Sequence, residues 1–316
     1  MSHPVLFDTD PGIDDAMALL FAHYSPDVDL VGITTTFGNA AIEQTTRNAQ
    51  LLNGMFGLGC EVHMGAGSPL VLAPDEPPAF VHGEDGLGDA GLEAPPLAPD
   101  GDAVRFIVDT LKRRPGEITI VAVGRMTNLA EALAQAPEIT GLVKRVVIMG
   151  GALGLHGFSG NITPTAEANI YGDPHAASRV LAAPWPVTMV GLDVTMRTVM
   201  SDAHIAELAE RGGETGRFLQ RISAHYRRFY GTRGFAGFPI HDASALAYVL
   251  APELFGVAEG GLAVATNGPT LGQTVLAPEG KPPPGVHGTP LPVQEACVDV
   301  KGDEVVQLYL DTLLNA

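Results

Sequence analysis

Short hydrophobic stretches alternate along this chain with longer segments in which apolar residues recur at helical spacing. The stretches at 118–124 and 145–150 are almost continuously apolar, as expected for parallel strands covered on both faces. The pattern predicts five strands, at 4–8, 29–36, 118–124, 145–150 and 187–192. It predicts eight helices, at 14–24, 41–56, 102–113, 128–136, 173–183, 201–211, 214–230 and 242–250.

This alternation predicts an α/β fold with an open, mostly parallel, doubly wound (Rossmann-like) sheet flanked by helices. The segments at 298–300 and 305–310, which are Val-Asp-Val and Val-Val-Gln-Leu-Tyr-Leu, suggest a final strand pair, hence a small antiparallel extension at the C-terminus. The 316 residues, 46% hydrophobic, suffice for one large domain or two closely joined ones. We expect residues 1–316 to form a single domain.

Local signals refine this prediction. Asp173 before Pro174 is typical of a helix N-cap followed by a first-turn proline. Thr127 or Asn128 is a candidate cap for the helix after the 118–124 strand. Three segments rich in Gly and Pro are expected to be irregular, either functional loops or mobile surface. They span residues 66–101, 231–241 and 268–294.

Charge and composition narrow the classes of partner. The formal net charge is −18 and no Lys/Arg-rich run occurs, so nucleic acid is not expected as a partner and a neutral or cationic substrate fits more easily. Cys60 and Cys297 form no metal-binding spacing, and two scattered thiols are more typical of a reduced compartment, although one disulfide stays open. Without a signal peptide or an apolar run of membrane-spanning length, we expect a cytoplasmic protein with no membrane contact.

Four carboxylates crowd into the turn that follows the first predicted strand. They are Asp8, Asp10, Asp14 and Asp15, with Pro11 and Gly12 breaking the strand between them. Carboxylates this close repel one another unless one is protonated or a cation neutralises them. Helix capping is the simpler alternative, but four acids directly after a buried strand favour a divalent metal ion with oxygen ligands, or a catalytic site.

Other predicted strands also end in polar residues, at 34–39, at 124–128 and at Asp193. In doubly wound sheets, ligands bind at the carboxyl ends of the strands. His241 and Asp242 precede an apolar helix, so Asp242 is either an N-cap or a metal ligand with a neighbouring general acid.

Further candidates are weaker when taken singly. Asn161, Glu167 and Asn169 offer amides and a carboxylate suited to hydroxyl recognition, although taken alone they are better explained by ordinary turn chemistry. Tyr226 and Tyr230 share a helix face and either stack on a flat heterocycle or belong to the core. The chain contains no GxxxxGK[ST], HExxH or GxSxG motif.

Taken together, these residues resemble the inosine–uridine-preferring nucleoside hydrolase family. The strongest match is the segment 8–15, which fits the family's DxDPGxDD signature. Weaker matches follow in consistent order over nearly the whole chain. They lie at 34–39, 45–49, 82–83, 126–128, 149–151, 167–169, 172–174 and 241–243.

The resemblance implies a bound Ca²⁺ ion with the ligands Asp10, Asp15, Asp242 and the main-chain carbonyl of Thr127. Asp10 would also be the general base for the attacking water, and Asp8 would orient the ligands. Asp14 and Asn169 would hold ribose hydroxyls. Asn161 and Glu167 would bind the 5′-hydroxyl, and Asn39 would lie near the ribose and the water. His241 would face the leaving base, and His82, otherwise an ordinary surface loop histidine, would close over it.

The implied reaction is hydrolysis of the N-glycosidic bond of ribonucleosides to free base and ribose, with a homodimer or homotetramer as the family precedent. A metal ion can lower the pKa of water, carboxylates suit a developing oxocarbenium ion, and His241 can assist the departing nitrogen. Position 168 is Ala, where several members of the family carry an aromatic residue. A small residue at this position would enlarge the pocket or change its contacts with the base. Base preference stays open.

The same residues are compatible with two other functions. Asp8 and Asp10 after a first strand also resemble an aspartate-nucleophile phosphotransferase, in which Asp8 would be phosphorylated and Mg²⁺ bound. The continuation to Asp15 argues against that reading. The third possibility is a protein that binds nucleosides or sugars without cleaving them.

Overall fold

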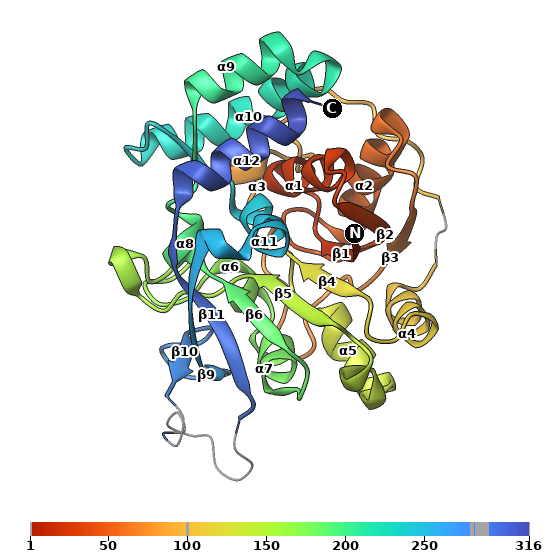
Figure 1. The fold of residues 1–316 in the computed structure, drawn as a ribbon, viewed down its shortest axis with the longest axis vertical. Helices are drawn as coiled ribbons and strands as arrows, with labels where there is room; N and C mark the ends of the chain where they lie inside the picture. The colour runs from red at the N-terminus through yellow and green to blue at the C-terminus, as the bar shows by residue number, and fades with distance from the viewer. Residues whose placement is uncertain (1, 99–100, 279–280, 282–290, 316) are drawn as a thin grey trace.

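The computed structural model describes residues 2–98, 101–278, 281 and 291–315. Within this part of the chain, nine strands form one mixed sheet in the order β10-β9-β11-β6-β5-β4-β1-β2-β3 (Figure 1). All neighbours from β3 to β11 pair in parallel, whereas β9 is antiparallel to β11 and to β10. The strands are β1 (His3–Thr9), β2 (Val28–Thr35), β3 (Glu61–Met64), β4 (Thr119–Ala122), β5 (Arg145–Met149), β6 (Val187–Val190), β9 (Phe255–Val264), β10 (Thr274–Ala277) and β11 (Val293–Val300).

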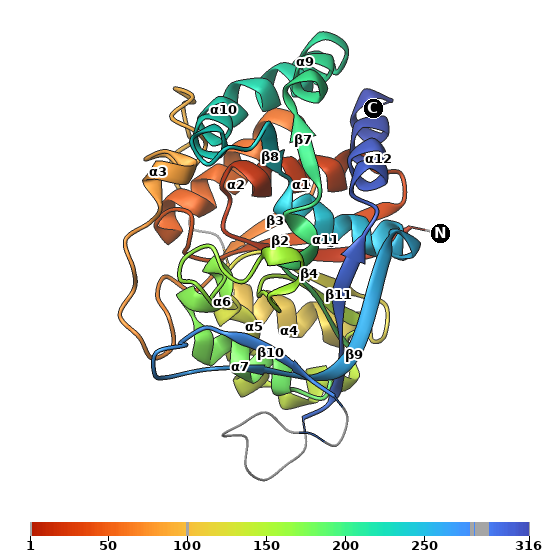
Figure 2. The same cartoon turned by 90° about the vertical axis from the view of Figure 1, so that its left-hand side faces the viewer.

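Helices cover both faces of the sheet (Figure 2). One face carries α1 (Ile13–Tyr24), α2 (Ile42–Phe56), α11 (His241–Leu250) and α12 (Gly302–Leu314), with α9 (Asp202–Arg211) and α10 (Gly213–Thr232) beyond them. The other face carries α4 (Ala103–Arg113), α5 (Thr127–Gln135) and α7 (Pro174–Ala182). The shorter elements are α3 (Ala79–His82), η1 (Pro137–Gly141), η2 (Leu155–Gly157), α6 (Ala168–Gly172), α8 (Leu192–Thr195), η3 (Pro252–Leu254) and the separate antiparallel pair β7 (Val199–Ser201) and β8 (Gly237–Pro239).

The apolar runs of the central strands form this arrangement because successive side chains point to opposite faces. In β1, Val5 and Phe7 join the hydrophobic cluster under α1 and α11, whereas Leu6 joins the cluster under α4, α5 and α7. In β4, Val121 belongs to the cluster under α1 and α11, and Ile120 belongs to the cluster under α4, α5 and α7. A strand with both faces buried needs apolar residues at every position, and this explains why these strands lack a polar alternation.

The predicted fold class, the five strands and the eight helices are confirmed, with boundaries shifted by at most two residues. The Asp173 cap is also confirmed, since its Oδ1 accepts from the amide of Ala176 at 3.0 Å. The cap at Thr127 or Asn128 is wrong. The Thr127 hydroxyl donates to Asp173 Oδ2 at 2.9 Å, and the Asn128 amide donates to Asp8 Oδ1 at 2.8 Å.

The C-terminal extension is antiparallel, but the predicted strand at 305–310 is wrong. Those residues belong to α12, where the buried positions recur at helical spacing. The antiparallel partner of β11 is instead β9, which the sequence analysis did not predict, and β10 lies within the segment expected to be irregular. Of that segment, residues 279–280 and 282–290 lie outside the described part of the chain. Among the helices described, none has the length and apolar character needed to cross a membrane, and both cysteines are free thiols.

Candidate active site

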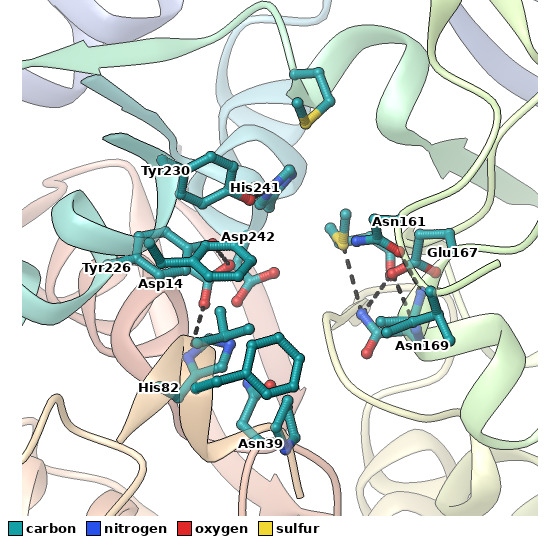
Figure 3. A pocket seen from close by; sticks show the side chains of 18 of the residues that line it. Asp14, Asn39, His82, Asn161, Glu167, Asn169, Tyr226, Tyr230, His241 and Asp242 are labelled. Atoms are coloured by element: carbon teal, nitrogen blue, oxygen red, sulfur yellow. Dashed lines mark hydrogen bonds and ion pairs between the residues drawn. The ribbon is translucent and has the colours of Figure 1, made fainter. Parts of the chain in front are cut away.

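A cavity of about 590 Å³ opens at the carboxyl ends of the central strands. Its wall includes Asp14 after β1, Asn39 after β2, Val123 after β4 and Met149 at the end of β5. Ten of the predicted site residues line the cavity (Figure 3). They are Asp14, Asn39, His82, Asn161, Glu167, Asn169, Tyr226, Tyr230, His241 and Asp242. The structure thus brings together side chains spread over more than 200 positions of the sequence, as the convergence of strand ends predicted.

The turn between β1 and α1 is built around the Asp15 carboxylate. Its Oδ1 accepts from the Thr9 hydroxyl at 2.5 Å and from the Asp10 amide at 3.2 Å, and its Oδ2 accepts from the Gly12 amide at 2.9 Å. Asp15, in the first turn of α1, therefore accepts from the amide of the N-cap residue Gly12, which is one half of a capping box. The Asn39 side chain donates a further bond to Asp15 Oδ2 at 2.8 Å, which joins this turn to the loop after β2.

Asp10, Asp14, Asp15 and Asp242 are all at least 94% buried, and we call them the acidic cluster. Candidate ligand atoms of Asp14, Asp15 and Asp242 lie within 4.8 Å of one another. Burial raises the pKa of all four carboxyls, and mutual repulsion raises the pKa of Asp14 further, to about 8. Oδ1 of Asp10 and Oδ1 of Asp14 are buried without a hydrogen-bond partner. A cation coordinated by these oxygens would remove both the repulsion and the unsatisfied acceptors.

Of the three aspartates expected as metal ligands, Asp15 and Asp242 belong to the close group, which contains Asp14 as a further candidate and does not include Asp10. Asp10 lies next to the close group and is tied to Asn39, whose amide donates to Asp10 Oδ2 at 2.8 Å. Asp10, Asp15 and Thr127 do not line the cavity, although Asp10 and Asp15 are linked to its wall through Asn39. The ligand role of the Thr127 carbonyl stays a prediction.

Across the cavity from the acidic cluster lie three side chains from the segment around α6 (Figure 3). Glu167 is the N-cap of α6 and accepts from the amides of Asn169, Ile170 and Gly151 at 2.9, 3.1 and 3.0 Å. The Asn169 side-chain NH₂ donates to the Val123 carbonyl at 2.7 Å, so its Oδ1 is left as an acceptor. Asn161 accepts from the Ala168 amide at 3.0 Å, which leaves its NH₂ as a donor.

His82, Tyr226, Tyr230 and His241 form part of the wall opposite α6, and we call them the His–Tyr group. His241 Nε2 lies 2.8 Å from the Tyr230 hydroxyl, and its Nδ1 lies 2.7 Å from the Thr195 hydroxyl. The Tyr226 hydroxyl donates to Asp14 Oδ2 at 3.2 Å. The two tyrosine rings pack edge to face at 4.9 Å, so they belong to the core and to the cavity wall at the same time.

The two histidines of this group are neutral near pH 7. Burial lowers the pKa of His241 to about 4 and the pKa of His82 to about 3. His82 Nδ1 accepts from the Ile13 amide at 3.3 Å, so its proton is carried by Nε2. His82 is thus held against the first turn of α1, and it is a buried wall residue rather than an ordinary surface histidine.

Two polar residues near the predicted set have other surroundings. Asp8 is fully buried outside the cavity wall, and its Oδ1 accepts from the Thr34 hydroxyl at 2.6 Å and from Asn128. These two bonds give the Asp8 carboxylate a structural role in joining β1 to β2 and α5, and they offer no support for its phosphorylation in a phosphotransferase. Asp193 accepts from the amides of Leu153 and Leu155 and fixes their loop, so this strand end supports the site only indirectly.

Thr195 and Arg125 are among the side chains that contact predicted site residues and that the sequence did not single out. Thr195 bonds His241, and Arg125 pairs with Asp10 Oδ2 at 3.3 Å. Arg125 lies within the polar strand end at 124–128, which is the signal that could have found it.

The sequence matches the model of the family described as "Inosine-uridine preferring nucleoside hydrolase" over residues 5–307. It is 40% identical over 305 residues to "Non-specific ribonucleoside hydrolase RihC" from Escherichia coli O1:K1 / APEC, covering 96% of both chains. It is 37% identical over 276 residues to "Uridine nucleosidase 1" from Arabidopsis thaliana, covering 86% of this chain and 81% of that relative.

Solved structures agree with these matches. The plant nucleoside hydrolase PpNRh1 superposes with a TM-score of 0.93 at 30% identity, with complete coverage of both chains. The purine-preferring ribonucleoside hydrolase from Gardnerella vaginalis superposes with a TM-score of 0.89 at 32% identity, covering 99% of this chain and 98% of that chain.

Proposed function

Because the chain belongs to the inosine-uridine preferring nucleoside hydrolase family, and is thus an N-glycosidase acting on ribonucleosides, we propose that it releases base and ribose with a bound Ca²⁺ ion and Asp10 as general base. The observation that carries this proposal is the acidic cluster. It places buried, mutually repelling carboxylates and two unpartnered oxygens beside a cavity of nucleoside size.

The donor set of the acidic cluster suits a hard divalent cation. All its side-chain ligand atoms are carboxylate oxygens, with no sulfur and no histidine nitrogen in the close group. Such a set favours Ca²⁺ or Mg²⁺ over zinc or copper. We infer Ca²⁺, with Asp10, Asp15, Asp242 and the Thr127 carbonyl as ligands and Asp14 as a further candidate. When bound, the ion would supply Lewis-acid activation of the attacking water.

The side chains around α6 would hold the ribose. Asn169 Oδ1 and Asp14 Oδ1 accept no hydrogen bond among the described contacts and suit the donor protons of ribose hydroxyls. The Asn161 NH₂ would donate to the 5′-hydroxyl. Glu167 would act there chiefly by fixing α6, because three amides already occupy its carboxylate.

In the reaction, water oxygen would bond to C1′ while the bond from C1′ to the base nitrogen breaks. Asp10 Oδ1 would take the water proton. Negative charge in the acidic cluster would stabilise the positive charge that develops on the sugar. The leaving nitrogen must gain a proton or a strong hydrogen bond. His241 would provide it, supported by the Tyr230 hydroxyl 2.8 Å from its Nε2.

The proposal is tested with inosine, adenosine, uridine and cytidine, each assayed for free ribose and free base. The protein is compared as purified, after chelation, and after return of Ca²⁺ or of Mg²⁺. We expect release of ribose that chelation abolishes and Ca²⁺ restores. Intact nucleosides throughout the panel, with folded and Ca²⁺-loaded protein, would refute catalysis, and binding without cleavage would leave the nucleoside-binding alternative.

The remaining expectations concern the whole protein. A homodimer or homotetramer in the cytoplasm, with no nucleic acid or membrane partner, remains our proposal, as does a single domain over residues 1–316. Ala168 lies in the cavity wall, so the inference that a small residue there widens the pocket stands as a prediction.

A further inference from the structure

Arg125 follows β4 and lies almost fully inside the protein, with its side chain 11% exposed. Its Nη1 atom lies 3.3 Å from Asp10 Oδ2 and 3.3 Å from the Phe37 carbonyl. The guanidinium also lies over the Phe37 ring, 5.0 Å from its centroid. In the part of the chain that the structure describes, it is the only Lys or Arg side chain that pairs with a member of the acidic cluster.

Three glycines from different loops leave room for this ion pair. A Cβ atom at Gly38 would overlap both Asp10 Oδ2 and Arg125 Nη1. A Cβ atom at Gly172 would overlap Arg125 Nε, and one at Gly124 would lie 2.7 Å from Asp10 Oδ1. The ion pair therefore fills a space that a side chain at any of the three glycines would occupy. The backbone of these three loops surrounds the pair and fixes its geometry.

The ion pair is not explained by fold stability alone. Arg125 Nε is buried without a hydrogen-bond partner, so the residue bears an uncompensated desolvation cost. Metal affinity does not explain it either, because a guanidinium next to a cation site repels the cation.

The contacts of Asp10 indicate what Arg125 does. Asp10 Oδ2 accepts hydrogen bonds from the Asn39 amide, at 2.8 Å, and from Arg125. Asp10 Oδ1 is buried and has no hydrogen-bond partner. We propose that Arg125 is a positioning residue that fixes Oδ2 of Asp10 and thereby presents Oδ1 alone to the attacking water. This inference rests on the proposed function, since it concerns the same reaction.

The test compares Arg125→Ala with wild type as Ca²⁺-loaded enzymes. Misplacement of a catalytic group by about 1 Å can cost about 100-fold in rate, so we expect kcat to fall about 10- to 100-fold with KM changed less than about threefold. Calcium affinity, measured by isothermal titration, should be no weaker than in wild type because a neighbouring positive charge has been removed. Millimolar guanidinium should restore part of kcat by occupying the vacated space.

Two further variants keep the inference testable if Arg125→Ala folds poorly. Gly172→Ala places a methyl group whose three nearest neighbours are all atoms of Arg125, so it should displace Arg125 and lower kcat without guanidinium rescue. Arg125→Lys keeps the charge but not the planar fork, so its kcat should be intermediate. The matched control is Arg145→Ala, which removes a guanidinium that pairs with Glu295 at 3.4 Å near the amino end of β5. It should show wild-type kcat and no response to guanidinium.

The outcomes separate this inference from the function on which it rests. An active wild type with kcat of Arg125→Ala within twofold would overturn the positioning role alone. So would a loss of activity that saturating Ca²⁺ fully repairs, or the absence of guanidinium rescue in a folded Arg125→Ala protein. A wild type that releases no ribose would overturn the proposed function, and the positioning role with it.

Discussion

The His–Tyr group lies in one cavity wall beside Asp14 and Asp242 of the acidic cluster, yet the two groups satisfy their polar atoms in opposite ways. The acidic cluster has buried oxygens without partners and carboxyl groups whose pKa is raised by burial and mutual repulsion. In the His–Tyr group, both ring nitrogens of His241 face hydroxyls and the two histidines are neutral near pH 7.

This difference shows which part of the site is complete without a ligand. The His–Tyr group needs nothing further to be stable, because a buried polar group with a hydrogen-bond partner bears little cost. The acidic cluster reaches a comparable state only if protons or a cation reduce its charge. Each region should therefore respond to a different perturbation.

The largest expected effect comes from Asp10 in the acidic cluster. Asp10→Asn preserves shape and the contact with the Asn39 amide but removes the base, so we expect kcat to fall about 1,000- to 10,000-fold. Steady-state assays at saturating Ca²⁺ measure this loss. As a matched control, Asp193→Asn changes an aspartate that fixes a loop outside the cavity wall and should retain most of the activity. Similar kcat values for the two variants would show that Asp10 is not the general base.

His241→Gln should have a smaller effect, which depends on the leaving group. The variant removes the imidazole that contacts Tyr230, and we expect about 100-fold lower kcat on purine nucleosides because the departing nitrogen loses its assistance. With a nitrophenyl riboside, whose phenolate leaves without a proton, the variant should be close to wild type. An equal loss on both substrates would show that His241 acts on the fold or the sugar instead.

The smallest expected effect is a change in the pH dependence of stability, measured as the thermal midpoint. In metal-free protein, the pKa of Asp8 is raised to about 7 and that of Asp14 to about 8, so folded protein binds more protons than unfolded protein up to those values. Stability is therefore lost as pH rises through them. His82 and His241, with lowered pKa, oppose this trend only below their usual pKa of 6.5.

Between pH 6.5 and 8, the thermal midpoint of the metal-free protein should accordingly fall by about 2–5 °C. Saturating Ca²⁺ should flatten this dependence, because a bound cation holds the carboxylates ionised across the range. Parallel pH curves with and without Ca²⁺ would indicate that the ion does not bind at the acidic cluster.

The sequence alone determined the features that depend on neighbouring residues. The turn at 8–15 concentrates four carboxylates within eight positions, so a charge problem exists there whatever the rest of the chain does. Strand and helix periods are likewise local, which is why the five central strands and eight helices could be predicted. The helix at 305–310 was mistaken for a strand because a short apolar run does not by itself distinguish the two.

Only the tertiary structure decided which distant groups meet. Arg125 pairs with Asp10 across 115 positions, and Tyr226 reaches Asp14 across 212. Such contacts follow from the order of strands in the sheet and from the path of α10 and α11, neither of which local periodicity encodes. The same holds for the burial that lowers the pKa of His241, because desolvation depends on everything that packs around a side chain rather than on its neighbours in sequence.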